Sequence, residues 1–544
     1  MKDFFEIFQF EWKHIKSQKL VLIMFIVINL LESMIGLASA MIFGNSIDRM
    51  LVNSTMEAII SSAILFLGLN LFSFVIGYFA KTSGQMAMEL CVKECKMTMT
   101  AYIEKLSLNY VEKTGSSSFM QRMNYDIQML IMYVLNTCSS IPQNILVFLI
   151  ALIVIAQIDL VCAFMAVIEL PIIVILYKSF ESKLAAYARK CADKREEEYT
   201  QLNELVMDVG HIKKNGIYKV LQKRYEKAED EYIKSTISCV RLEYLYSVLN
   251  ENMDVFLRVF LFFYGGISVI NGKMTVGEFT IVYSFFSMIT SSCAYFLNFG
   301  KQIQDAGAFY HRLKEIVDVP EESNGDIDLD TIDTISFSHV DFGYNENEIV
   351  VKDFSYTFEK GKMYVVAGEN GSGKSTMISM LSGMYIDEFN GQILYNNIPI
   401  QALDMRKIRK EKMGICEQEP FLINDTIRFN MIYSNENVVD DKLMKLADVV
   451  SFDNFLKNSE NGLDTMVGES GNNLSGGQKQ KTALVKVFYK NPDVMILDEP
   501  TSAMDTVGQE QLINYLSEIR KDKIIIVVTH DPVLMECADE VVRM

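Results

Sequence analysis

Six long apolar runs constrain the fold of this chain more than any other feature of its sequence. They lie at residues 20–43, 57–80, 139–156, 160–177, 253–270 and 276–299. The hydrocarbon layer of a membrane offers no water to peptide groups, so a segment that crosses it must satisfy its own hydrogen bonds, and about 20 residues of helix span that layer. The sequence therefore predicts six transmembrane helices.

The positions of Lys and Arg predict how these helices are oriented. The stretches 81–138 and 178–252 carry six and fourteen bases, whereas the three short gaps between runs carry only Arg49 and Lys273. Basic loops remain on the cytoplasmic side of a membrane. We therefore expect a multi-pass protein of the plasma membrane, compatible with a bacterial one, whose long loops and two termini are cytoplasmic.

The parts outside the apolar runs have helical patterns of their own. Phe4, Phe5, Phe8 and Trp12 are interleaved with charges, which predicts a helix along the inner membrane surface, or alternatively an amphipathic helix of the protein core. Both long loops have helical periodicity interrupted by glycine-containing turns, at 114–115 and 209–216. We expect helices that leave the membrane, turn at a tip that can contact a cytosolic domain, and return.

The C-terminal part differs from the rest in charge. From Gly325 onward there are 36 acids and 21 bases, whereas the preceding residues hold 33 acids and 30 bases. Short β-rich runs at 335–340, 363–367, 494–497 and 523–528 alternate with helical patterns there, which predicts a cytosolic α/β domain. We place a transmembrane domain at 1–305, a linker at 306–330 and the α/β domain at 331–544. The lack of clustered bases argues against a nucleic-acid partner.

Residues 368–375 read Gly-Glu-Asn-Gly-Ser-Gly-Lys-Ser and stand between a predicted strand and a predicted helix. This is the P-loop pattern in its required context, in which backbone N–H groups surround phosphate oxygens. Lys374 is expected to bridge the β- and γ-phosphates of ATP, and the Ser375 hydroxyl to bind Mg²⁺. The residues assigned to this nucleotide site are Gly368, Asn370, Gly371, Ser372, Gly373, Lys374, Ser375 and Thr376.

Two acids end the apolar strand 494–497. Asp498 is placed to hold Mg²⁺ through water, and Glu499 to polarise the attacking water as a general base. The alternative, a buried strand with a solvated acidic end, is weak beside a P-loop.

A second anion-binding motif precedes that strand. Ser475, Gly476, Gly477 and Gln478 open a predicted helix, whose N-terminus favours negative charge. With this motif the chain resembles one half of an ABC transporter, of the exporter type in which six spans precede one nucleotide-binding domain. The resemblance covers essentially the whole chain. It implies an α-helical transmembrane domain of the type I or type IV ABC exporter fold and a C-terminal α/β P-loop NTPase domain that hydrolyses ATP.

The resemblance also implies roles at matching positions. Tyr344 is similar to the aromatic residue that stacks on adenine, and Gln418 to the glutamine that senses Mg²⁺ and the transmembrane tips. Asp505 matches the D-loop, and His530 the histidine that contacts the γ-phosphate. The helix that begins at residues 475–478 carries Gln480-Lys481 and Val485-Lys486-Val487 where relatives usually have Gln-Arg and Ala-Arg-Ala. Since the charge is partly kept, we expect this departure to affect the kinetics of ATP hydrolysis rather than to abolish it.

In this family residues 475–478 face the P-loop of an opposing domain, so the resemblance implies a partner chain, identical or not. Residues 110–126 and 203–215 resemble the two cytoplasmic loops whose short helices dock on the ATPase domains, one of them on the partner's. An importer on the same fold shares every motif. A non-transporting member of the family often lacks the general base or the histidine, and Glu499 and His530 argue against that function.

Two acids inside the predicted spans bear on the cargo. Buried charge in a membrane is costly and usually functional, so Glu32 and Glu169 could line a cavity for a cationic or amine-bearing cargo such as a modified peptide. The alternative is that they are protonated or hydrogen-bonded between helices. Asp254 and Arg258, one helical turn apart, are expected to pair with each other.

Overall fold

The computed structural model describes residues 2–53, 55–207, 209–344, 349–369, 371–433, 440–502 and 504–544. The chain forms two compact units. One comprises residues 1–100 and 119–317, and the other comprises residues 101–118 and 318–544. We refer to them as the helical unit and the α/β unit and describe each by itself.

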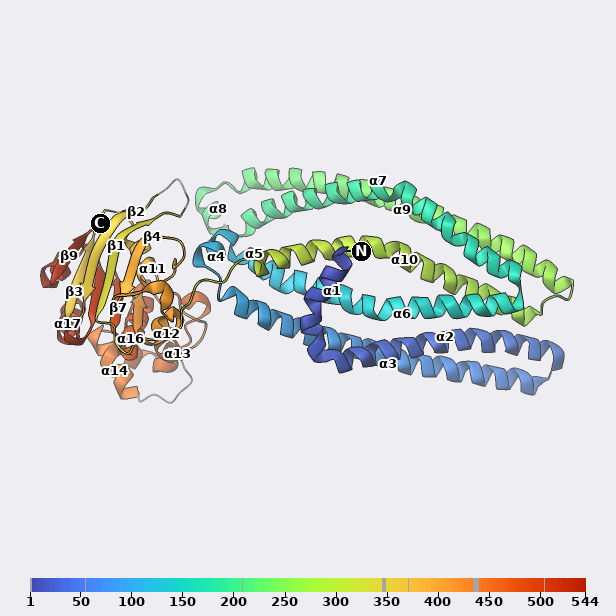
Figure 1. Ribbon diagram of the computed structural model, residues 1–544, viewed down its shortest axis with the longest axis horizontal. Helices are drawn as coiled ribbons and strands as arrows, with labels where there is room; N and C mark the ends of the chain where they lie inside the picture. Colours follow the sequence, from blue (N-terminus) through green and yellow to red (C-terminus); the bar gives the residue numbers. More distant parts are fainter. Residues whose placement is uncertain are drawn as a thin grey trace. The chain divides into compact units, whose positions relative to one another are not determined.

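Long helices make up the helical unit (Figure 1). In chain order they are α1 (Lys2–Ile15), η1 (Lys16–Gln18), α2 (Lys19–Asn53), α3 (Met56–Ile103), the π-helix η2 (Arg122–Asp126), α6 (Ile127–Ile158), α7 (Leu160–Met207), α8 (Val209–Asn215), α9 (Tyr218–Ile270) and α10 (Val276–Val317). The helix α5 (Ser116–Gln121) leads into η2. The α7 helix pairs with α9, and α10 packs against α6 and α2.

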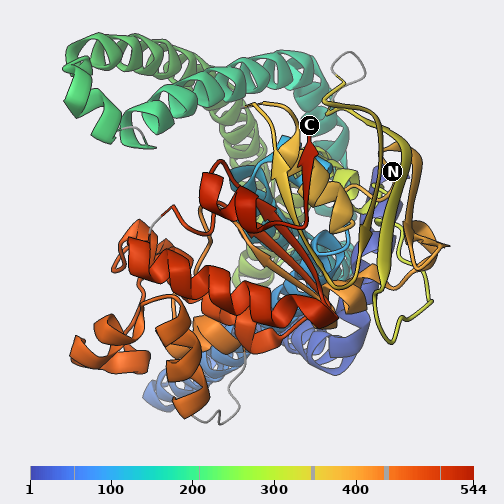
Figure 2. The ribbon, with the colours of Figure 1, turned by 90° about the vertical axis from the view of Figure 1, so that its left-hand side faces the viewer.

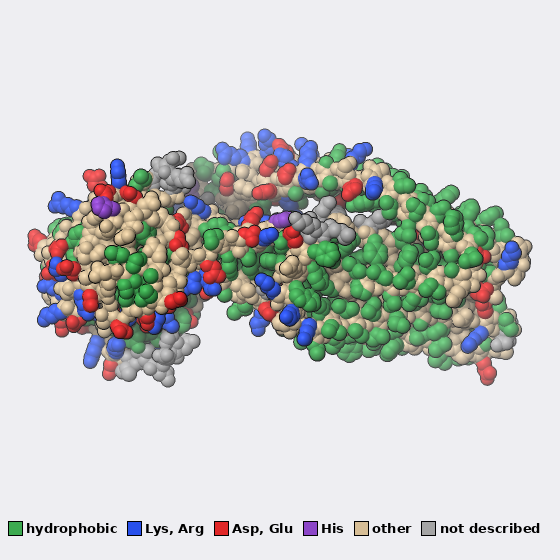
Figure 3. Space-filling view, viewed as in Figure 1, with side chains coloured by type: hydrophobic (Ala, Val, Ile, Leu, Met, Phe, Trp, Pro, Cys, Tyr) green, Lys and Arg blue, Asp and Glu red, His purple; other side chains and the backbone are tan. Residues whose placement is uncertain are grey.

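Six helical segments of the described chain are long and apolar enough to cross a membrane, one for each predicted run. Several are much longer than a span requires: α3 and α7 have 48 residues each, or about 70 Å of helix at 1.5 Å per residue, against a hydrocarbon layer of about 30 Å. The space-filling view shows hydrophobic side chains covering much of the surface of the helical unit (Figure 3). Exposed large hydrophobic side chains of these helices include Leu65, Phe74 and Phe262. The predicted orientation in the membrane stays a prediction.

The N-terminal helix α1 has one buried side and an exposed aromatic surface on other sides. Ile7, Glu11 and Ile15, spaced four residues apart, are buried in a core with α3, α6 and α10. Phe5 and Trp12 lie 66% and 46% exposed on other sides of the helix, where they can contact lipid. Burial raises the pKa of Glu11 to about 8, so its carboxyl is protonated at neutral pH. One side of α1 thus belongs to the protein core, and its exposed aromatic side chains lie on the surface.

Glu169 and Asp254, two acids inside the predicted spans, bond to other side chains of the helical unit. Glu169 on α7 is fully buried, and both of its carboxylate oxygens lie 3.0 Å from the Thr290 hydroxyl on α10. This is the second of the two alternatives, a hydrogen bond between helices. Glu32 is half-buried and lies against Gly77 of α3. The pairing of Asp254 with Arg258 is confirmed, at 2.8 Å, and Arg258 also donates to Ser287.

A buried ion pair joins the π-helix η2 to α10. Asp126 is fully buried, and Arg312 donates to its two oxygens from Nε and Nη2, each at 2.7 Å. Arg122 donates to the Arg312 carbonyl and pairs with the exposed Glu315. Two parallel bonds from one guanidinium fix both distance and angle, so this pair holds the extension of α10 against the start of α6.

We expect Arg312→Ala to destabilise the protein by about 3–5 kcal/mol, because it leaves the buried Asp126 carboxylate without a partner. The measurement is thermal unfolding of the purified protein in detergent. Arg189→Ala is the control, since it removes the same charge from an exposed position of α7 and should have a much smaller effect. Equal melting temperatures for the two variants would contradict this account.

The α/β unit contains two sheets. A four-stranded antiparallel sheet has the order β2-β1-β4-β5, and a five-stranded parallel sheet has the order β6-β7-β8-β3-β9. The strands are β1 (Thr334–Phe342), β2 (Val351–Glu359), β3 (Lys362–Ala367), β4 (Asn390–Tyr395), β5 (Ile398–Pro399), β6 (Met413–Cys416), β7 (Val494–Asp498), β8 (Ile524–Val528) and β9 (Glu540–Arg543). The strands predicted at 335–340, 363–367, 494–497 and 523–528 correspond to β1, β3, β7 and β8.

Helices pack around the two sheets, and Figure 2 shows this unit facing the viewer. In chain order the helices of this unit are α4 (Leu108–Thr114), α11 (Lys374–Leu381), η3 (Ile400–Ala402), α12 (Met405–Glu411), α13 (Ile427–Ile432), α14 (Asp440–Val449), α15 (Asp453–Asn458), η4 (Gly462–Asp464), η5 (Glu469–Gly471), α16 (Gly476–Lys490), α17 (Thr506–Ile519), η6 (Arg520–Asp522) and α18 (Pro532–Cys537). Alternate residues of the central strands enter two different cores. Tyr364 and Val366 of β3 join the antiparallel sheet, and Met363 and Val365 join α13–α17. Burial on both faces explains the unbroken apolar runs of β7 and β8.

Candidate active site

The loop between β3 and α11 has the backbone shape of a phosphate-binding loop. Gly371 and Gly373 have φ of +86° and +93°, which side chains rarely adopt, and Gly373 is the N-cap of α11. A Cβ atom at Gly368 would lie 2.6 Å from the Ser372 hydroxyl and 2.8 Å from the Met544 carbonyl oxygen. Glycine at these positions is therefore a steric requirement of the loop.

Two side chains in this loop indicate where an anion fits. The Lys374 ammonium donates to the carbonyl oxygens of Gly368 and Glu369, at 2.7 and 2.9 Å, and so lies across the loop. The Ser372 Oγ atom is buried and has no hydrogen-bond partner among the described residues. An unpaired buried hydroxyl is costly, and a phosphate oxygen would satisfy it.

The loop borders a pocket of about 550 Å³ that brings most of the predicted site residues together. Its lining includes, from the predictions, Tyr344, Gly371, Gly373, Lys374, Ser375, Thr376, Gln418, Asp498, Glu499 and His530. These residues come from segments nearly 190 positions apart in the sequence, since residues 344 and 530 both line the pocket. Asn370 lies outside the described residues.

The two acids after β7 lie at the centre of this pocket. Burial, reinforced by the neighbouring Glu499 carboxylate, raises the pKa of Asp498, and the Lys374 ammonium opposes this shift. Asp498 and the Ser375 hydroxyl offer the hard oxygen donors that Mg²⁺ prefers, so the donor set fits that ion.

Glu499 is held in place by several bonds. Its backbone N–H donates to the Val528 carbonyl (2.8 Å), and its carboxylate accepts from the Thr529 hydroxyl (3.1 Å). Gln480 donates to the Glu499 carbonyl oxygen at 2.7 Å. The backbone of Glu499 has a φ of +48°, which is uncommon for a residue with a side chain, and such positions cluster at functional sites. The fixed backbone directs this carboxylate into the pocket.

The motif at residues 475–478 lies elsewhere in the α/β unit. Ser475 caps α16: its hydroxyl accepts from the Gln478 N–H, and its own N–H donates to the Gln478 side chain. Ser475 and Gly476 are exposed, and a Cβ atom at Gly476 would meet nothing within 4 Å. None of the residues 475–478 lines the nucleotide pocket. The anion-binding end of α16 is thus formed, exposed and outside the pocket of its own chain.

The remaining predicted residues have structural contacts as well. The Tyr344 hydroxyl is 2.9 Å from the Thr376 hydroxyl, and its ring meets Tyr385 edge-on. Asp505 is the N-cap of α17 and accepts from the Gly508 N–H. Gln418 and His530 are exposed in the pocket. Their functional roles stay predictions.

Several residues of this site escaped prediction. Val350 and Val528 line the pocket, and Gln480 and Thr529 hold Glu499. Gln480 matches the glutamine of the Gln-Arg pair that the family usually has there, and Lys481 replaces the arginine. Gln480 is 2% exposed and also accepts from the Ser502 hydroxyl. None of these four residues had been assigned a contact with Glu499 or a place in the pocket from the sequence.

The helix α4 is part of the α/β unit, although it comes from the first long loop. Leu108 packs against the core of the antiparallel sheet, and Asn109 donates to Glu388 at 2.5 Å. Lys113 donates to the Tyr344 carbonyl oxygen at 3.2 Å. This loop tip therefore bonds directly to a residue of the nucleotide pocket, as expected for a tip that contacts a cytosolic domain.

The tip of the second long loop belongs to the helical unit. The helix α8 occupies the segment predicted as a turn. It buries Ile212 and leaves Lys213 and Lys214 exposed. Docking of this helix on an ATPase domain stays a prediction.

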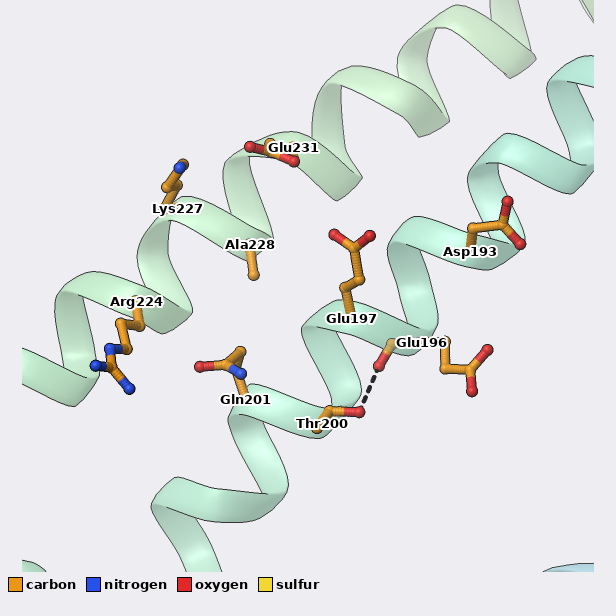
Figure 4. A pocket seen from close by; sticks show the side chains of 9 residues that line it. All are labelled: Asp193, Glu196, Glu197, Thr200, Gln201, Arg224, Lys227, Ala228 and Glu231. Carbon is orange, nitrogen blue, oxygen red and sulfur yellow. Dashed lines mark hydrogen bonds between the residues drawn. The ribbon is translucent and has the colours of Figure 1, made fainter.

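A groove of about 770 Å³ lies between α7 and α9, and Figure 4 shows its charged side chains on the two facing helices. Acids and bases both line it. Lys194 of α7, next to it, bridges the two helices by its contact with Glu231 of α9 (2.8 Å), and it also contacts Glu197 of its own helix (2.7 Å). Charges of both signs that bond to each other are typical of a solvated helix pair, so we assign this groove to helix pairing.

Comparisons with known proteins agree with this architecture. The family model described as ABC transporter transmembrane region matches residues 22–293, and that described as ABC transporter matches residues 351–502. An ATP-dependent lipid A-core flippase of Syntrophus aciditrophicus is 25% identical over 83% of this chain and 75% of its own. A protein of Staphylococcus aureus named "Putative multidrug export ATP-binding/permease protein" is 23% identical over 97% of this chain and 93% of its own. In fold, the chain is similar to a bacterial Atm1-family ABC exporter with ATP bound, with a TM-score of 0.84, 18% identity, and coverage of 97% and 93%.

Proposed function

This chain belongs to the ABC transporter family and hydrolyses ATP to drive transport, and we propose that it acts as one half of a dimeric exporter in the plasma membrane. The proposal of a dimer rests on one observation. The P-loop and both acids share one pocket, while the anion-binding end of α16 is exposed outside that pocket. A second chain that brings its own α16 to this pocket would complete the site.

The proposed chemistry follows from the pocket. The loop N–H groups and Lys374 bind the β- and γ-phosphates, and Tyr344 lies where a base could stack. Ser375, Asp498 and Gln418 would hold Mg²⁺, which when bound neutralises charge on the phosphates. Glu499 accepts a proton from the attacking water, and His530 contacts the γ-phosphate. The partner's copy of residues 475–478 would close the site on the opposite side, and Asp505 would lie at the same interface.

Coupling to the membrane would run through α4. Its contact with the Tyr344 carbonyl oxygen links the first cytoplasmic loop to the nucleotide pocket. Closure around ATP would therefore move the loop and the long helices that carry it. The names of the relatives, a lipid A-core flippase and a putative multidrug exporter, support export of an amphipathic cargo, and we extend this to a cationic small molecule or a peptide.

Transport of defined sidedness tests this function. The protein is reconstituted into lipid vesicles, and ATP is supplied only to the outside, where it reaches only the chains whose α/β unit faces outward. For an exporter we expect ATP-dependent accumulation of an organic cation inside those vesicles, none with ATP and Glu499→Gln, and none without Mg²⁺. ATP-driven loss of preloaded cation from the vesicle interior would instead indicate an importer and overturn the export direction.

A further inference from the structure

The N-terminal helix α1 crosses the long helices of its unit (Figure 1) and packs against α6 and α10. Two ring contacts fasten it to α10. Phe10 meets Tyr310 edge-on with centroids 5.4 Å apart, and Phe4 meets Phe299 edge-on at 5.8 Å. The α10 helix ends at Val317, and the residues that follow belong to the α/β unit. The N-terminal helix therefore braces the last helix before that unit.

Glu11 is the acid that α1 places in this packed interface. The side chain is fully buried, and neither of its carboxylate oxygens has a hydrogen-bond partner among the described residues. An ionised carboxylate without a partner is far more costly to bury than a neutral carboxyl. The raised pKa of Glu11, about 8, has this burial as its cause. The interface therefore accepts Glu11 in its neutral form.

The groups of α3 near Glu11 do not offset a negative charge. The thiols of Cys91 and Cys95 are buried near the Glu11 carboxyl. Thiols are uncharged around neutral pH, because their ordinary pKa is about 8.5. Glu94, on the same helix, lies close to both thiols and carries a negative charge itself. An ionised Glu11 would therefore find no cation among these groups.

The helices α6 and α10 do not supply a partner either. The side chains that α6 buries between residues 127 and 135 are apolar. On α10, the titratable side chain in this core is the phenol of Tyr310, and the Lys314 ammonium lies over its ring, 5.6 Å from the centre. The Arg312 guanidinium is engaged by both oxygens of Asp126. Among the described residues, none of these groups forms a hydrogen bond with Glu11.

We propose that α1 is a pH-sensitive clamp on α10, which is closed while Glu11 is neutral and opens as the pH rises. The sign follows from where the proton is held. Docked α1 keeps the proton on Glu11 up to about pH 8, whereas released α1 loses it at the ordinary, lower pKa of a glutamate. Docking therefore weakens by up to about tenfold per pH unit between these two values and changes little above about pH 8.

Opening of the clamp would remove the two ring contacts that brace α10. The helix would then keep its contacts with α2 and α6, including the pair of Arg312 with Asp126. The clamp requires neither ATP nor cargo, so it is independent of the proposed function.

The test uses Cys95, which is fully buried in the same core as Glu11 and is reached by a thiol reagent when that core opens. The full-length protein in lipid nanodiscs is treated with N-ethylmaleimide between pH 6 and 8.5, and mass spectrometry gives the labelling rate of each cysteine. Wild type is compared at each pH with Glu11→Met, which is apolar and of similar length, so the reactivity of the thiol itself cancels.

We expect the ratio of the wild-type rate to the Glu11→Met rate at Cys95 to rise about tenfold from pH 6 to 7 and to level off above about pH 8. Cys293, buried in a different core, is the internal control, and its ratio should stay at one. Glu89→Gln removes an exposed acid of α3 and should behave as the wild type does. A ratio at Cys95 that stays constant over this pH range would overturn the clamp.

A second variant separates the charge of Glu11 from its polarity. Glu11→Gln buries an unpaired amide, so Cys95 should be labelled faster than in Glu11→Met at every pH. The ratio between these two neutral variants should not change with pH. If Glu11→Gln instead shows the pH dependence of the wild type, ionisation of Glu11 is not its cause and the proposal fails.

Discussion

Glu499→Gln is expected to lower steady-state ATP hydrolysis by about 10²–10⁴-fold, the usual contribution of a general base. The carboxylate lies in the pocket with Lys374 and Asp498, and its backbone is fixed by bonds to Val528 and Gln480. Glutamine has the same size and can still accept from Thr529, so the change removes the base and keeps the geometry. ATP should then bind and persist, and the two α/β units should remain closed around it.

The measurement is phosphate release by the purified protein, combined with the amount of ATP retained per chain. Glu417→Gln is the matched control, because Glu417 is an exposed acid that influences the pKa of Asp498 but does not line the pocket. It should retain most of the activity. A Glu499→Gln variant with wild-type turnover would remove Glu499 from the role of base.

Lys374→Ala is expected to weaken ATP binding by about 10- to 100-fold, since hydrogen bonds to charged groups contribute about 1.5–3 kcal/mol. The ammonium that now bonds to the Gly368 and Glu369 carbonyl oxygens would turn to the phosphates when ATP enters. Binding of a fluorescent ATP analogue measures the effect. Lys352→Ala removes the same charge from an exposed position on β2 and should bind as the wild type does. Equal affinity in both variants would contradict the assignment.

Residues 475–478 form the other half of the proposed site, and a change there should block ATP hydrolysis rather than ATP binding. Ser475→Asp keeps a good N-cap for α16, because aspartate caps helices as well as serine does. It adds a negative charge where the γ-phosphate of the partner's ATP would lie. We expect ATP hydrolysis to be lost while ATP binding to the variant's own P-loop is retained. Ser475→Asn, which caps without charge, should remain active.

The sequence predicted those parts of the fold that depend on local periodicity. Each apolar run corresponds to one long helix, and the four predicted strands are found within two residues of their expected ends. The pocket was predictable because β3 and β7 belong to one parallel sheet, whose strands present their carboxyl ends at the same edge. This rule places Lys374 near Asp498 although 124 positions separate the two residues in the chain.

Other features depend on which helix faces pack against each other in the folded chain. The sequence of a single segment does not reveal this. Glu169 could have faced a cavity or a neighbouring helix, and only the position of Thr290 on α10 decides this. Gln480 and Thr529, which hold Glu499 in place, lie in α16 and directly after β8. No pattern in the sequence predicts that they contact Glu499.

The central claim is that each ATP site is built from two chains, and mixing two inactive variants tests it most directly. Chains with Lys374→Ala and chains with Ser475→Asp are given different tags, expressed together, and isolated as complexes that carry both tags. In such a complex one site has both defects and the other has none, so we predict ATP hydrolysis at about half the wild-type rate, with each variant alone inactive. Mixed complexes as inactive as either variant alone would contradict the shared site.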